Sequence, residues 1–264
     1  MATGKSVAQE YASATEPEVR HIGPGDLKDA LALGLDDFKA KPSHLLLLVL
    51  IYPLVGIFLI RYTFGEDILP LVFPLIAGFT LIGPVAAVGL YEISRRRELG
   101  LDISWRHAFD VFHSHSFWSI AAIGLLQMMI YFAWLGTALL IYQAIFGSDV
   151  PSTLYGFVNE IFMTTKGWQL IVIGSIVGSL FALLVLAISA ISFPLLLDKD
   201  VGVRTAVQTS LKAFQVNPMT MLMWGVIVGA TLALGALPLF VGLAVVMPIL
   251  GHATWHLYRK IVAA

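Results

Sequence analysis

The apolar and polar positions of this 264-residue chain separate into long uncharged runs joined by short polar segments. A run of about 20 apolar residues is long enough to cross the roughly 30 Å hydrocarbon core of a bilayer. The last run is too long for one crossing, but Gly235-Ala236-Leu237-Pro238 has the composition of a tight turn. We therefore predict six transmembrane helices, at residues 44–60, 68–91, 117–146, 168–197, 219–235 and 238–258.

Two polar segments repeat each other, and each precedes a pair of apolar runs. Residues 27–42 (LKDALALGLDDFKAKP) align without a gap with residues 203–218 (VRTAVQTSLKAFQVNP). A fainter third copy begins at Trp105, with Ser104 placed to cap a short helix. The alignment predicts three repeat units, each an amphipathic helix followed by a transmembrane hairpin, near residues 24–92, 101–197 and 201–258.

The first of these segments has the pattern of an amphipathic helix. Asp26 is the expected N-cap and Pro42 the expected end. One stripe of this helix carries its large apolar side chains, Leu27, Leu31, Leu35 and Phe38. We expect such helices to lie in the headgroup region of the bilayer. Residues 1–23 show no periodicity and are predicted to be a disordered tail before a single membrane domain at 24–260.

The charges predict the orientation of the chain in the membrane. With both termini in the cytoplasm, fourteen Lys and Arg residues lie on the cytoplasmic side and two, Arg61 and Lys166, on the other. Such a bias follows the positive-inside rule for the cytoplasmic loops of membrane proteins. The triplet Arg95-Arg96-Arg97 is interpreted as a determinant of topology or as a site for anionic lipid. Apolar residues make up 58% of the chain and charged residues 12%, and the net charge of −1 does not favour binding to nucleic acid.

Few residues of the sequence are candidates for ligand binding or catalysis. His252 and His256 are four positions apart and share a helix face, so they are candidate ligands for haem or a metal, although the spacing of a known zinc helix is missing. Small residues at four-residue spacing predict close helix packing, at Gly174, Gly178, Gly225 and Gly229. The predicted membrane runs contain no Asp, Glu, Lys or Arg, which argues against an ion-coupled pump. No catalytic motif is present, so we expect neither an enzyme nor a bound cofactor.

The paired segments that close with Phe38 and Pro42, and with Phe214 and Pro218, together with six hairpin helices, resemble a known family. It is a family of bacterial integral membrane proteins catalogued as a domain of unknown function and sometimes labelled as related to cytochrome c oxidase subunit I. The resemblance covers about residues 24–260 and implies a bacterial inner-membrane location. The oxidase label fits poorly. That subunit is similar to a twelve-helix protein with histidine ligands on several helices, whereas this chain has six predicted helices and, within them, a single histidine pair, His252 and His256.

Three interpretations of function remain open. The first is a non-enzymatic accessory, assembly or scaffolding subunit of a larger membrane complex, for example a respiratory complex. The second is a facilitator or channel for a small neutral or apolar solute, which the proline-interrupted second run favours. The third is a haem- or metal-binding membrane protein that uses His252 and His256.

Overall fold

The computed structural model describes residues 17–40, 69–71, 74–75, 81, 83–147, 153–238 and 240–263. Throughout these residues the chain is helical, apart from turns and one isolated antiparallel bridge between Val19 and Val262. The all-α prediction is therefore confirmed for the described part. Its elements are α2 (Pro24–Ala40), η2 (Leu69–Leu71), α5 (Gly83–Ala86), α6 (Val88–Glu98), η3 (Trp105–His113), α7 (Phe117–Phe146), α8 (Leu154–Met163), α9 (Thr165–Ser189), α10 (Ser192–Asp198), α11 (Gly202–Val216), α12 (Pro218–Ala236) and α13 (Leu243–Ile261).

Three helical segments of the described chain are long and apolar enough to cross a membrane. They are Phe117–Phe146, Thr165–Asp198 and Pro218–Ala236, which correspond to the third, fourth and fifth predicted runs. The first run, 44–60, lies outside the described residues, and the second, 68–91, is described only in part. The sixth run corresponds to α13, which is not among the three, since its last turns carry His252, His256, Arg259 and Lys260.

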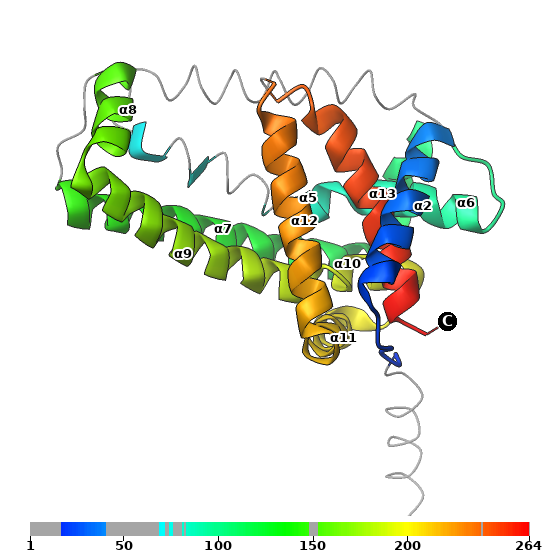
Figure 1. Cartoon of the computed structure of the whole chain (residues 1–264). Coiled ribbons are helices and arrows are strands. Elements are labelled where there is room, and N and C mark those ends of the chain that lie inside the picture. Colours follow the sequence, from blue (N-terminus) through cyan, green and yellow to red (C-terminus); the bar gives the residue numbers. More distant parts are fainter. Residues whose placement is uncertain are drawn as a thin grey trace, which may run out of the picture.

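Helices α7 and α9 form one pair and helices α12 and α13 a second, which lies at a steep angle to the first (Figure 1). Helices α7 and α9 run side by side, with α8 at one end of the pair and α6 and α10 at the other. Helix α12 contacts α13 and is steeply inclined to α9, so the predicted hairpins do not run parallel. Where the pairs meet, a Cβ at Gly225 would lie 2.8 Å from the side chain of Leu186. Contact through a small residue lets the two backbones approach closely.

Helix α2 differs from the sequence prediction at its start and in its buried face. Asp26 is not the N-cap: the helix begins at Pro24, and the Asp26 carboxylate reaches back to accept a hydrogen bond of 2.9 Å from the backbone N–H of Gly23. The buried residues are Leu27, Ala30, Gly34 and Asp37, whereas Leu35, which the apolar stripe included, is exposed. Leu27 and small residues face the protein, where the small residues allow α13 to approach, whereas Leu33 and Leu35 face outward.

Residues 17–23, which the prediction placed in the tail, are held by hydrogen bonds. The N–H of Arg20 donates to the carbonyl of Ile261, and the N–H of Ile22 donates to the side-chain oxygen of Asn217, both over 2.8 Å. Asn217 is buried and also donates to the carbonyl of Arg20. One polar side chain before α12 therefore ties the N-terminal segment to the rest of the chain.

The two aligned amphipathic segments bury equivalent positions. In α11 the buried residues are Ala206, Thr209, Ser210 and Ala213. In the gap-free alignment Ala206 corresponds to Ala30, Ser210 to Gly34 and Ala213 to Asp37. The two helices pack against different partners, α2 mainly against α13 and α11 against α9, α10 and α7. Asp37 thus introduces a buried charge where the other copy has alanine.

Candidate functional site

Several of the segments predicted to be cytoplasmic meet in one layer of charged side chains at one end of the α7–α9 pair, which we call the charged layer. It joins α2, α6, η3, the end of α10 and the end of α13. Arg259 of α13 donates to Glu98 of α6 over 3.0 Å and to Asp198 of α10 over 3.3 Å. Lys260 pairs with Asp26 and Asp29 of α2. These contacts connect elements that are far apart in the sequence.

Asp37 is the buried centre of the charged layer, with 8% of its surface exposed. Its Oδ2 lies 2.8 Å from Nε2 of His256 and accepts a hydrogen bond of 2.6 Å from Ser94. Its Oδ1 accepts a hydrogen bond from Arg97, whose other terminal nitrogen donates to Asp36 over 2.8 Å. Donors from α6 and α13 therefore satisfy this carboxylate of α2.

These donors determine the protonation of Asp37. Burial alone would raise the pKa of the carboxyl group, because it disfavours the charged form. Hydrogen bonds from His256, Ser94 and Arg97 outweigh burial and lower the pKa to about 2. The opposite balance holds at Glu92, where burial raises the pKa although Arg95 and Arg96 oppose it. Asp37 is consequently ionised at neutral pH.

Ser94, Asp37 and His252 resemble a nucleophile with its base, but the proton arrangement does not fit that role. Ser94 Oγ lies 2.8 Å from Nδ1 of His252 and donates its single proton to Asp37. Nδ1 of His252 must then be the donor to Ser94, since a hydroxyl has only one proton. A histidine that donates to the hydroxyl cannot remove a proton from it. Ser94 is also 1% exposed, so the arrangement joins helices instead of presenting a nucleophile.

The two candidate histidines lie together in the charged layer, and each has a ring nitrogen engaged with Ser94 or Asp37. Within the described residues, no group of three or more His, Asp or Glu side chains is arranged to hold a metal ion. A cavity of about 350 Å³ adjoins His256 between α2, α6 and α13. Its charged lining residues pair with one another: Asp36, Asp37, Arg97, Glu98 and Arg259.

The arginine triplet lies on the last turn of α6, and each member forms an ion pair. Arg95 lies 3.7 Å from Asp198, and Arg96 lies 3.2 Å from Asp110 of η3. Arg97 binds Asp36 and Asp37. Arg95 and Arg96 also pair with the nearby Glu92. The sequence showed the positive cluster but not its partners on other elements, because those are 14 or more residues away in the chain.

The four candidate packing glycines have two kinds of surroundings. A Cβ at Gly178 would lie 3.0 Å from Trp134, and one at Gly225 would lie 2.8 Å from Leu186. At Gly174 and Gly229 no described atom lies within 4 Å of that position. A further close approach between two helices involves Gly34, which sequence reasoning missed: its Cβ would be 2.6 Å from the backbone nitrogen of Ala253.

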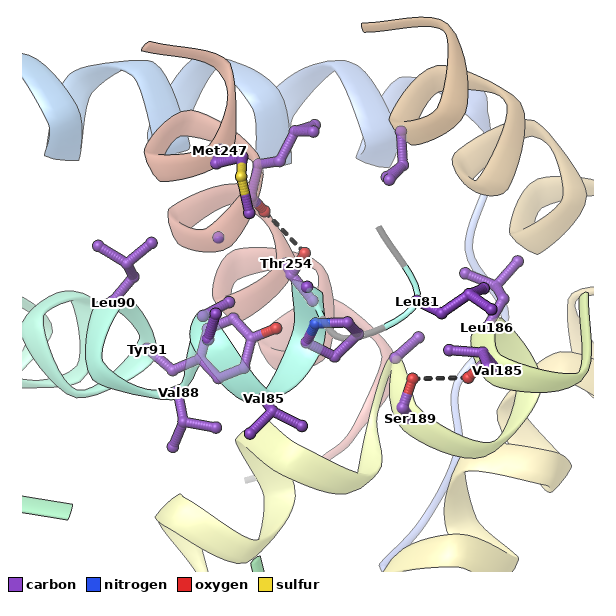
Figure 2. Close-up of a pocket in the computed structure, with 18 of the residues that line it drawn as sticks. Leu81, Val85, Val88, Leu90, Tyr91, Val185, Leu186, Ser189, Met247 and Thr254 are labelled. Carbon is purple, nitrogen blue, oxygen red and sulfur yellow. Dashed lines mark hydrogen bonds between the residues drawn. The ribbon is translucent and has the colours of Figure 1, made fainter. Parts of the chain in front are cut away.

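A large cavity lies beside the charged layer, where the two helix pairs cross (Figure 2). It has a volume of about 1350 Å³, more than the roughly 300–1,000 Å³ typical of small-molecule sites. Its walls come from α5, α6, η3, α7, α9, α12 and α13, and none of its described lining residues is charged. Hydroxyl groups occur at four lining positions, Tyr91, Ser179, Ser189 and Thr254. The cavity is therefore suited to an uncharged, mainly apolar molecule.

Among the described residues, three helices long and apolar enough to cross a membrane indicate an integral membrane protein. Consistent with this class, residues 72–198 match the profile of a family described as "Predicted integral membrane protein (DUF2189)". The predicted resemblance to an integral membrane family of unknown function is thus confirmed over slightly less than half of the chain. That description names neither an oxidase subunit nor a bacterial source. No curated protein and no solved structure matches the chain.

Proposed function

We propose that this protein is a non-enzymatic membrane protein that binds a chain-like apolar molecule in the large cavity, as a carrier or facilitator. The observation that carries the proposal is the uncharged cavity of about 1350 Å³ between helices of membrane-spanning composition. Burial of apolar surface contributes about 25 cal/mol per Å². A long hydrocarbon chain lying against such walls would gain stabilisation without any specific polar contact.

An entrance for this molecule is supported by aromatic side chains at one edge of the cavity. Phe109 and Phe112 of η3 line the cavity and are about half exposed or more, at 50% and 61%. Phe112 lies 5.8 Å from Phe117, and Phe117 lies 5.3 Å from Trp118, measured between ring centroids. The rings form a continuous path from the outward-facing side of α7 to the cavity. Aromatic residues are common at the interface between membrane and water.

The charged layer supports an orientation in which both termini lie on one side of the membrane, the cytoplasmic side of a bacterial inner membrane. Four predicted cytoplasmic segments are in direct contact there, through Arg97 with Asp37, Arg259 with Asp198 and Lys260 with Asp26. Helix α8 and Lys166 lie at the other end of the α7–α9 pair. We propose that this other end faces the opposite side.

The test of function is the identification of the molecule that stays bound. The protein is purified in mild detergent. Lipid extraction identifies the bound compound, and native mass spectrometry then measures how much of the protein carries it. Gly229→Trp fills the cavity, whereas Gly174→Trp is a matched control, because neither glycine has a described atom within 4 Å of its Cβ position but only Gly229 lines the cavity. We expect a neutral apolar compound with the wild type and Gly174→Trp, and reduced occupancy with Gly229→Trp. Equal occupancy in all three proteins would refute the proposal.

An accessory role in a larger membrane complex is the second candidate. It is favoured by Gly174 on α9, which contacts none of the described residues across its helix face and would allow close contact with a helix of another protein. Purification at native expression levels tests it. A partner that is retained by the wild type and lost with Gly174→Trp supports this role, and isolation of the protein alone contradicts it.

A further inference from the structure

We infer that α8 is an interfacial helix, which lies along the membrane surface opposite the charged layer and inserts Tyr155, Val158 and Phe162 among the lipids. This inference rests on the proposed orientation of the α7–α9 pair and not on what the cavity holds. Three observations carry it: the placement of α8 across the end of the pair, the division of its surface into three sectors, and the side chains beside it.

Helix α8 stands at one end of the α7–α9 pair, at a steep angle to both helices (Figure 1). Both members of the pair are long and apolar enough to cross a membrane. Helix α8 has 10 residues and is therefore about 15 Å long, which is half of the roughly 30 Å hydrocarbon core. A short helix placed across the end of two membrane-crossing helices runs along the surface of the bilayer.

Hydrogen bonds at both ends hold α8 in this position. Thr153 caps its start, because its hydroxyl accepts a hydrogen bond of 3.1 Å from a backbone N–H of the first turn. At the other end the hydroxyl of Thr164 donates to the carbonyl of Glu160 over 2.7 Å and accepts from the N–H of Gly167 over 3.0 Å. A Cβ at Gly167 would overlap the carbonyl oxygen of Ile161, so a side chain there would force the corner between α8 and α9 apart.

The residues of α8, at about 100° per residue, fall into sectors that face different surroundings. One sector faces the protein and holds the partly buried Phe157 and Ile161. The ring centroid of Phe157 lies 6.4 Å from that of Tyr142 on α7. The opposite sector holds Asn159 and Glu160, together with a glycine and the terminal methionine, and we assign it to the water side.

The remaining sector is a stripe of large apolar side chains that point away from the protein. Tyr155, Val158 and Phe162 follow the i, i+3, i+7 spacing of one helix face. Their exposed fractions are 83%, 43% and 53%. A helix that meets protein on one side and water on another buries such a stripe when it lies in the boundary between headgroups and acyl chains.

The side chains next to α8 are those that prefer this boundary. Lys166 and Trp168 lie in the first turn of α9, and Trp168 is 56% exposed. The Lys166 ammonium group lies 5.9 Å from the ring centroid of Phe146, the last residue of α7. Trp and Tyr are enriched where a membrane meets water, and Lys extends its charge from there to the headgroups. Together with Tyr155 they mark this end of the pair as the headgroup level.

The experiment measures the depth of single nitroxide labels in the full-length protein, reconstituted in phosphatidylcholine nanodiscs. The chain has no cysteine, so Tyr155→Cys, Phe162→Cys and Glu160→Cys each carry one label. Collisions with oxygen, which concentrates in the bilayer, are compared with collisions with a water-soluble nickel chelate. We expect labels at Tyr155 and Phe162 to favour oxygen, at a depth of about 5–10 Å into the boundary. The matched control Glu160→Cys, on the other side of the same helix, should favour the nickel chelate.

Each alternative placement of α8 gives a different pattern. Labels that all favour the nickel chelate place α8 in water and overturn the inference. Labels that all favour oxygen place the whole helix inside the bilayer and overturn it as well. Labels at Tyr155 and Phe162 that are shielded from both reagents mean that protein covers the stripe, which rules out lipid as its partner. None of these results changes the occupancy of the cavity, which the comparison of Gly229→Trp with Gly174→Trp measures separately.

Discussion

Nε2 of His256 lies 2.8 Å from Oδ2 of Asp37, although the two residues are 219 positions apart. This contact joins α2, the first described helix, to α13, the last. The same carboxylate binds Ser94 and Arg97 of α6. Three helices from distant parts of the sequence are therefore held by one buried charge, beside the walls of the apolar cavity.

Acid should weaken this junction in a defined pH range. The folded-state pKa of Asp37 is lowered from 3.8 to about 2, so its stabilisation is complete above pH 4 and is lost as the pH falls from about 4 to 2. The difference amounts to about 2 kcal/mol. Thermal unfolding in detergent at several pH values measures it. Asp37→Asn should lower stability at pH 7 by about 3–5 kcal/mol, because it breaks a buried ion pair.

The neighbouring residue provides the control for this prediction. Asp36 also pairs with Arg97, but its side chain is 65% exposed. Asp36→Asn should therefore change stability by less than about 1 kcal/mol. Equal losses in the two variants would mean that burial of Asp37 is not what makes it important.

Close approach of α2 and α13 should make Gly34 intolerant of any side chain. In Gly34→Ala the new Cβ meets backbone atoms of Ala253 and Ile249 at 2.6–2.7 Å, so a helix must move. We expect a loss of about 1–3 kcal/mol in the free energy of unfolding. Gly174→Ala, with no described atom within 4 Å, should be neutral or gain up to about 1 kcal/mol from helix propensity. The opposite order of stability would show that α2 does not pack against α13 in this way.

Asn217 should control the order of the N-terminal segment. Asn217→Ala removes the acceptor for Ile22 and a donor to Arg20, at a cost of about 1–3 kcal/mol for buried groups left without partners. Hydrogen exchange at the amides of Ile22 and Arg20 should become faster. Thr231→Ala, on the same helix, removes only bonds to its own helix and should leave this exchange unchanged. Unchanged protection in Asn217→Ala would contradict the role of this residue.

The sequence pattern predicted the apolar helices well, because a long uncharged run has few other stable environments. The runs at 117–146, 168–197 and 219–235 correspond closely to α7, to α9 with α10, and to α12. It did not reveal the whole face that α2 turns to α13, because the predicted stripe held only large apolar residues and left out Ala30, Gly34 and Asp37. In a lipid environment apolar side chains gain little by facing the protein, so small residues such as Ala30 and Gly34 occupy the contact.

The candidate site was less predictable than the helices. His252 and His256 were recognised from their spacing, but Asp37 and Ser94 were not, since a charged residue on an amphipathic helix is normally assigned to its outer face. The partners of Arg97 depend on how α2 packs against α6, which no local pattern contains. The cavity arises from the crossing of two helix pairs, so spacing along one helix does not reveal it.

Cysteine accessibility tests most directly the central claim, that the charged layer lies on one side of the membrane. The chain has no native cysteine, so each introduced thiol is the sole reporter. Exposed positions are available in three segments predicted to be cytoplasmic, at Lys39, Asp102 and Lys212. A fourth, Lys166, follows α8 at the other end of the α7–α9 pair. With a membrane-impermeant maleimide on intact cells, we expect labelling of Lys166→Cys only, with the other three labelled after permeabilisation. Labelling of Lys166→Cys and Lys212→Cys from the same side would contradict the proposed orientation in the membrane.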